Sequence, residues 1–94
     1  MKYVLRYVTA DGVDPGLLGE LAPAHRAHWS SYLAERTLLA IGPMEHLADG
    51  ALAVFTTRQA AESFAAGDPF VTGGAVSSWT VTGWREAVLG QTEP

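Results

Sequence analysis

Four segments of the chain carry the pattern of β-strands. Residues 2–9 are rich in β-branched and aromatic side chains, and residues 75–84 alternate apolar with polar positions. A short apolar run at 38–41 stops at Gly42-Pro43, and Asp49-Gly50 indicates a hairpin turn before a further strand at 51–56. The pattern therefore predicts four short strands, with long connections after the first and third strands.

Two helices are predicted between these strands. We expect a short helical turn over 15–21 and a separate main helix from about Pro23 to Glu35, because proline inside a helix removes a hydrogen bond but is favoured at its first position. The second helix begins after a Thr57 cap and runs over 58–66 until Gly67. One side of the main helix then carries several ring-bearing side chains at helical spacing: His25, His28, Trp29 and Tyr32.

The order β-α-β-β-α-β predicts a ferredoxin-like α+β fold, with a four-stranded antiparallel sheet and both helices on one face. We expect a single domain over 1–94, with its core in 1–84, a C-terminal tail over 85–94 and fraying from Gly90 to Pro94. Outward side chains such as Tyr3 and Trp79 would leave an apolar patch too large for a small monomer. Two sheets facing each other in a homodimer would cover it.

Composition narrows the function. The chain of 94 residues has no cysteine, which excludes disulfides, thiolate chemistry and sulfur-ligated zinc. A net charge of −4 with six Lys and Arg disfavours nucleic acid as a partner. The N-terminus lacks the apolar run of a signal peptide, and no segment approaches the ~20 apolar residues of a membrane span. We expect a cytoplasmic protein with no membrane partner.

His25 is a candidate acid–base residue. It is predicted in the first turn of its helix, where the partial positive charge of the helix end disfavours imidazolium. A neutral imidazole can accept a proton, as a general base must. The simpler interpretation is a buried core histidine with one hydrogen bond.

Asp68 is the candidate partner, 43 positions further along. Asp followed by Pro69 is the pattern of a helix cap with proline at the first helical position, and Phe70 would then anchor the core. This structural role explains Asp68 without any chemistry. A capping carboxylate can also face one neighbour, but we do not expect it to serve many at once.

Four further residues are weaker candidates for binding a substrate. Tyr7, His28 and Trp29 are possible pocket-lining residues, and Arg6 is a possible anion contact, although a salt bridge would explain Arg6 equally well. His25 and His28 share a helical face, but no third ligand is obvious. We therefore expect no metal and no cofactor.

Three motifs at matching distances carry a family resemblance: Pro23-Ala24-His25, the run 38–44 that ends in Gly42-Pro43-Met44, and Asp68-Pro69-Phe70. Together with the opening strand they resemble the YciI-like (YCII-related domain) family over residues 1 to about 84. The resemblance implies a ferredoxin-like fold paired as a dimeric α/β barrel, with a His–Asp pair in a cleft. This chain departs at Arg36, where many members have glycine.

On that resemblance His25 takes the histidine position of the family and Asp68 the aspartate position. Relatives include an enzyme that eliminates chloride from a chlorinated hydroxyhydroquinone, but no motif here identifies that substrate. We expect a cofactor-independent acid–base enzyme, of lyase or isomerase type, acting on a small organic molecule. The alternatives are a non-catalytic small-ligand-binding or interaction domain with a dimer cleft, and a His–Asp pair that only pins two helices together.

Overall fold

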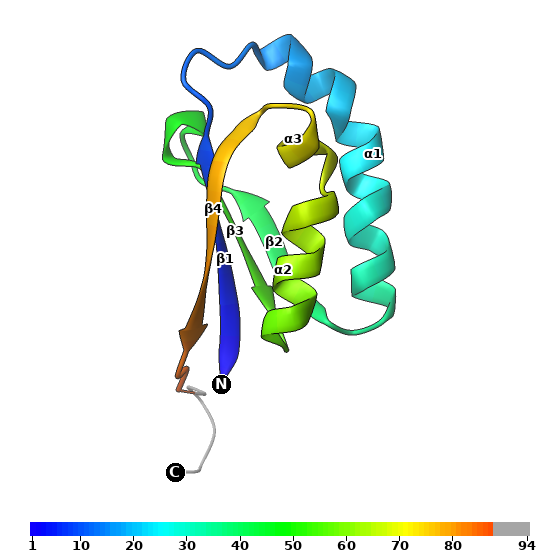
Figure 1. Cartoon of the computed structure of the whole chain (residues 1–94), viewed down its shortest axis with the longest axis vertical. Coiled ribbons are helices and arrows are strands. Elements are labelled where there is room, and N and C mark those ends of the chain that lie inside the picture. Colours follow the sequence, from blue (N-terminus) through cyan, green and yellow to red (C-terminus); the bar gives the residue numbers. More distant parts are fainter. Residues whose placement is uncertain (88–94) are drawn as a thin grey trace.

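The computed structural model describes residues 1–87, which form one antiparallel sheet covered on one side by helices. The elements in chain order are β1 (Lys2–Thr9), α1 (Pro15–Ala34), β2 (Leu38–Pro43), η1 (Leu47–Asp49), β3 (Ala51–Phe55), α2 (Arg58–Gly67), α3 (Pro69–Thr72) and β4 (Val76–Trp84). The strands lie in the order β2-β3-β1-β4, and the helices α1, α2 and α3 all lie on one side of them (Figure 1). The predicted ferredoxin-like α+β fold is confirmed.

The helix-facing side of the sheet forms the core. The side chains of Leu5, Leu38 and Phe55 are almost fully buried there and pack with Phe64 from α2. Tyr3 and Trp79 also pack against this cluster, so the prediction that they point outward is wrong. Side chains alternate between the two faces along a strand, so Tyr3 lies on the same face as Leu5. The helices cover that face.

The first helix is longer than predicted. α1 begins at Pro15, where the Asp14 side chain caps it by accepting a 2.9 Å hydrogen bond from the Gly16 N–H, and it continues through Pro23 to Ala34. Figure 1 shows its first turns inclined to the rest of the helix. The separate helix predicted from Pro23 is therefore wrong, because packing of α1 on α2 and α3 outweighs one lost hydrogen bond. The extension places His25 in the middle of the helix, so the predicted effect of the helix end on its imidazole does not apply.

The end of α1 shows why the departure at position 36 matters. Arg36 has φ 63°, in the left-handed region that glycine adopts without strain, and it is the one non-glycine residue with positive φ within residues 1–87. Its N–H donates to the Leu33 carbonyl at 3.0 Å and closes the helix. The turn into β2 is thus made with an arginine at the position that favours glycine.

The predicted turn at Asp49-Gly50 is part of a longer connection. Residues 44–50 join β2 to β3 and include η1, and the Met44 N–H donates to the Gly50 carbonyl at 2.9 Å. Gly50 has φ 84°, and a Cβ there would collide with the Tyr7 backbone carbonyl. Glycine is therefore required both by the backbone and by the close approach to β1.

The remaining elements agree with the sequence to within two residues. The Thr57 hydroxyl caps α2 by accepting from the Ala60 N–H at 3.1 Å, as predicted, and β2 extends two residues further than the apolar run. No helix in residues 1–87 is long and apolar enough to cross a bilayer. Of the tail predicted over 85–94, the part from residue 88 on, including the fraying predicted from Gly90 to Pro94, lies outside the described residues.

Candidate active site

Asp68 lies at the junction of α2 and α3, and its side chain is completely buried. It ends α2 and caps α3, where Pro69 takes the first helical position as predicted. The Phe70 N–H donates to its Oδ1 at 3.1 Å. A buried carboxylate requires partners for its remaining lone pairs, since an unpaired buried charge is strongly unfavourable.

Two further side chains, from α1 and β1, supply those partners. Nδ1 of His25 lies 2.8 Å from Oδ1 of Asp68, and the Tyr7 hydroxyl donates to Oδ2 at 2.6 Å. The fold thus brings together residues separated by 43 and 61 positions in the chain. The expectation that a capping carboxylate would not serve many neighbours is wrong: Asp68 holds three donors at once, because Oδ1 accepts from both His25 and the Phe70 N–H while Oδ2 accepts from Tyr7.

These contacts set the ionisation of the buried groups. Burial works to raise the pKa of Asp68, but hydrogen bonds from His25, Tyr7 and the Phe70 N–H outweigh it and hold that pKa below its ordinary value. Burial, together with the hydrogen bond and the charge of Asp68, raises the pKa of Tyr7 well above its ordinary value. At neutral pH Tyr7 is therefore a donor and Asp68 an ionised acceptor.

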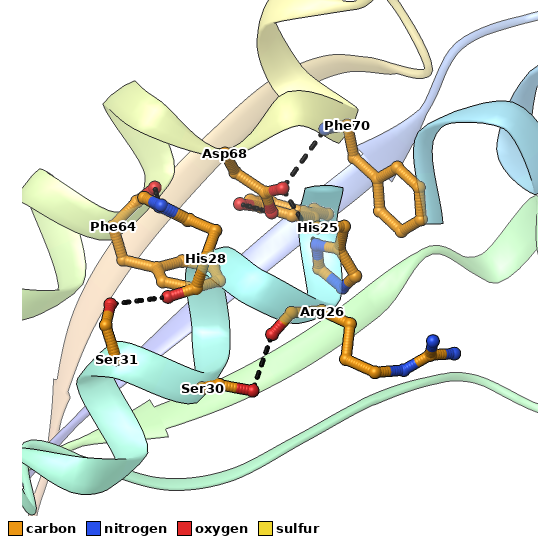
Figure 2. A network of polar contacts seen from close by, with 9 residues as sticks. His25, Arg26, His28, Ser30, Ser31, Phe64, Asp68 and Phe70 are labelled. Atoms are coloured by element: carbon orange, nitrogen blue, oxygen red, sulfur yellow. Dashed lines mark hydrogen bonds and ion pairs between the residues drawn. The ribbon is translucent and has the colours of Figure 1, made fainter. Parts of the chain in front are cut away.

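The ionised carboxylate determines the tautomer of His25. A carboxylate can only accept, so Nδ1 carries the proton and Nε2 of the neutral ring has a free lone pair. Within residues 1–87 Nε2 has no hydrogen-bond partner. The imidazole is held between Asp68 and the Phe70 ring, which stacks on it at 4.0 Å between centroids (Figure 2). Ring orientation and proton position are both fixed by neighbours.

His25 lines a pocket of about 390 Å³ between α1 and the sheet. Its other walls come from β1, β2, β3, α1 and α3: Leu5, Tyr7, Ala22, Arg26, Ile41, Gly42, Pro43, Ala51, Leu52, Ala53 and Phe70. The polar side chains on the whole lining are Tyr7, His25 and Arg26. A mainly apolar cavity of this size with a few convergent polar groups is typical of a small-molecule site.

The other predicted pocket residues lie elsewhere. Arg6 is exposed on the outer face of the sheet, away from the helices. His28 bonds the Phe64 carbonyl through Nε2 at 2.9 Å, and Trp29 packs against the core. Of the four weaker candidates, Tyr7 alone lines the pocket with His25.

Arg26 was missed by sequence reasoning, although it directly follows the Pro23-Ala24-His25 motif. Arg26 is exposed on α1 next to His25, so its sequence position indicates only a solvated charge. It lines a pocket because β2 lies alongside α1 in the folded chain. Within the part of the chain that the structure describes, no three His, Asp or Glu side chains are placed to hold a metal ion.

Comparison with known proteins agrees with this architecture. None of the curated proteins compared matches the chain. A solved structure of 5-chloro-2-hydroxyhydroquinone dehydrochlorinase from Burkholderia phenoliruptrix AC1100, in complex with 2,5-dihydroxybenzoquinone, matches with a TM-score of 0.75 and 18% identity, over 93% of this chain and 96% of that chain. At this identity the likeness shows a shared fold. The YCII-related domain model matches residues 1–85, and the chain therefore belongs to the YCII-related domain family.

Proposed function

We propose that this protein is a cofactor-independent enzyme of lyase or isomerase type that moves a proton on a small organic molecule. The observation that supports it is the His25–Asp68 pair at the wall of the pocket. Nε2 of His25 would accept the proton, and Asp68 would hold the ring in the required tautomer and stabilise the imidazolium that forms. Asp68 itself stays ionised throughout.

Tyr7 is a positioning residue in this proposal, because it touches Asp68 and acts through it. Its hydroxyl and the Phe70 N–H keep the carboxylate charged inside an apolar environment. The stacked Phe70 ring restricts the imidazole plane. These contacts would place the reacting lone pair before a ligand arrives, which lowers the cost of reaching the transition state.

The size and lining of the pocket favour a single-ring, mostly apolar substrate. A volume of about 390 Å³ is near the lower end of small-molecule sites. The structural neighbour is a dehydrochlorinase seen with a dihydroxybenzoquinone. Because that likeness shows the fold alone, we propose hydroxylated ring compounds as the substrate class and do not assign chloride elimination to this protein.

We further propose a cytoplasmic homodimer in which the uncovered sheet faces pair. Val8 and Trp84 on that face expose 53% and 50% of their surface, and a hollow of about 420 Å³ lies over Val4, Leu52 and Val54. Exposed apolar surface of this kind is a common interaction site.

Substitution of His25 by Gln tests the catalytic role. We expect kcat/KM to fall by about 10²-fold or more, because a general base contributes on that order. Turnover is followed by absorbance and by chloride release with a panel of hydroxylated and chlorinated hydroquinones. His28→Gln is the matched control, since His28 lies one turn along the same helix, also has its ring against Phe64, and does not line the pocket.

Binding separates this proposal from the two alternatives. Affinity for 2,5-dihydroxybenzoquinone, measured by calorimetry, should change little in His25→Gln if the histidine is catalytic. Tight binding without turnover of any compound would favour a non-catalytic ligand-binding domain. A lower melting temperature in His25→Gln and Asp68→Asn, with neither turnover nor binding in the wild type, would favour a purely structural pair.

A further inference from the structure

Arg26 is a second polar group on the pocket that the proposed chemistry does not use. It follows His25 on α1, lines the same pocket, and its side chain is exposed. Figure 2 shows the side chain leaving the helix beside His25 and running away from the Asp68 carboxylate. Within residues 1–87 its guanidinium makes no salt bridge and no hydrogen bond; its backbone carbonyl accepts from the Ser30 hydroxyl at 2.7 Å.

The side chains that line the pocket carry a positive formal charge, although the whole chain carries −4. No Asp or Glu is among the residues that line the cavity. The nearby carboxylate, Asp68, is completely buried and already accepts from His25, Tyr7 and the Phe70 N–H. Arg26 is thus the one permanently charged side chain on the lining, and no acidic group there competes for it.

The other walls increase the effect of that charge. Ile41, Pro43 and Phe70 present apolar surface, and an ion pair beside such walls is screened less than one in open solvent. Guanidinium is also suited to ligand oxygens, because its planar donors can meet two acceptors at once. A ligand with an ionised oxygen would find its partner next to the imidazole.

We propose that Arg26 selects the substrate by binding an ionised oxygen, a ring enolate or a carboxylate, on a planar molecule whose apolar ring fills the pocket. This inference rests on the proposed function, since it names the substrate class of the same site. His25 and Arg26 have separate roles in this proposal: the imidazole accepts the proton, and the guanidinium binds the negatively charged oxygen of the substrate. Arg26 is therefore a specificity-determining residue.

The test compares charged and neutral probes of equal shape. 2,5-Dihydroxybenzoquinone, whose hydroxyls are acidic, is paired with its neutral dimethyl ether, and benzoate is paired with benzamide. We expect Arg26→Gln to raise the Kd of the charged probes by about tenfold or more and to leave the neutral Kd unchanged. The charged probes should also lose most of their salt dependence, and Arg26→Lys should restore part of the affinity.

Arg36→Gln is the control, because it removes the same charge just beyond the C-terminal end of α1, outside the pocket. It should leave every Kd unchanged, and the melting temperature of Arg26→Gln should equal that of the wild type. Preference for the quinone or for benzoate identifies the source of the oxygen. Equal binding of charged and neutral probes, no binding of the charged probes, or equal losses in both arginine variants would overturn the role of Arg26. None of these outcomes bears on the His25→Gln turnover comparison, which tests the proposed function separately.

Discussion

At the scale of single residues, Asp68 connects everything in the candidate site. One carboxylate caps α3, accepts the Tyr7 hydroxyl and fixes the His25 ring. Each contact also compensates the cost of burying a charge, so folding and chemistry depend on the same hydrogen bonds. Removing one donor should therefore change both the stability and the pH response of the site.

Tyr7→Phe removes one donor and leaves the shape of the core intact. We expect it to lower the free energy of unfolding by roughly 1.5–3 kcal/mol, the range for hydrogen bonds to charged groups. The acid limb of the kcat/KM profile should move to higher pH, because Asp68 holds its charge less well. Chemical denaturation and pH–rate profiles measure the two effects.

Tyr32→Phe is the matched control for Tyr7→Phe, since the Tyr32 hydroxyl meets Ser63 at an exposed position at 2.9 Å. It should leave the profile in place. A Tyr7→Phe protein with lower stability and an unmoved acid limb would show that Tyr7 supports the fold alone.

The lowered pKa of Asp68 predicts a defined acid response. Because the folded pKa lies below the unfolded value, the stabilisation is complete above the unfolded pKa and is lost as pH falls through the folded one. The difference in unfolding free energy between wild type and Asp68→Asn should thus be largest at neutral pH and shrink in acid. A difference that stays constant with pH would contradict the buried ionised carboxylate.

The contribution of Glu86 to the pH dependence of stability must be separated from that of Asp68. Hydrogen bonds from Lys2 and from its own backbone lower the pKa of Glu86 to about 2, so it titrates in the same acid range. Carrying out the comparison in a Glu86→Gln background removes its contribution from both proteins.

At the scale of elements, α1 shows how tertiary packing overrides local signals. Pro23 costs the helix a hydrogen bond, and Arg36 closes it in a left-handed conformation, yet the helix spans Pro15–Ala34. Both features are unfavourable locally and are stabilised by packing of α1 on its neighbours. The backbone strain at Arg36 can be removed without changing any residue of the candidate site.

Arg36→Gly should stabilise the protein. Left-handed backbone costs a non-glycine residue roughly 1–2 kcal/mol, partly offset by the greater freedom of glycine in the unfolded chain. We expect a net gain of about 1 kcal/mol, or a melting temperature higher by about 4–8 °C for a domain of this size. Arg36→Ala is the control: it removes the same side chain, keeps the Cβ strain and should show no gain. Equal gains in both variants would assign the effect to the arginine side chain.

At the scale of the whole molecule, the helices cover one face of the sheet and leave the other open (Figure 1). That open face is apolar around Val4, Leu52, Val54 and Trp84. The sequence argument for a dimer named the wrong side chains, Tyr3 and Trp79, which lie on the covered face. The dimer proposal stands on the residues that the fold leaves outside.

Val54→Lys tests the dimer, because it places a second cation near Arg6 in the middle of the open face. We expect the wild type to have the mass of two chains in light scattering and the variant to shift towards one, by about tenfold or more in the dissociation constant. Gln59→Lys adds the same charge on α2 and should leave the mass unchanged. A wild-type mass of one chain would refute the dimer.

The sequence by itself determined the order of elements, the two capping residues Thr57 and Asp68, and the family motifs. These depend on local rules, such as side-chain alternation and the preference of proline for the first helical turn. Tertiary structure alone decided that α1 continues through Pro23 and that Tyr3 faces inward. Packing energy summed over many contacts, which no short segment contains, outweighed the local preferences there.

The site divides in the same way. His25 and Asp68 were found from the sequence because their motifs are specific at their spacing, and the fold places them 2.8 Å apart. The fold alone decided the remaining features. It gives the Asp68 carboxylate three donors, and it places Arg26 on the pocket. It also places Arg6, His28 and Trp29 outside that pocket. Which side chains share a cavity depends on how helix and sheet are rotated against each other, and this rotation is a property of the packed molecule.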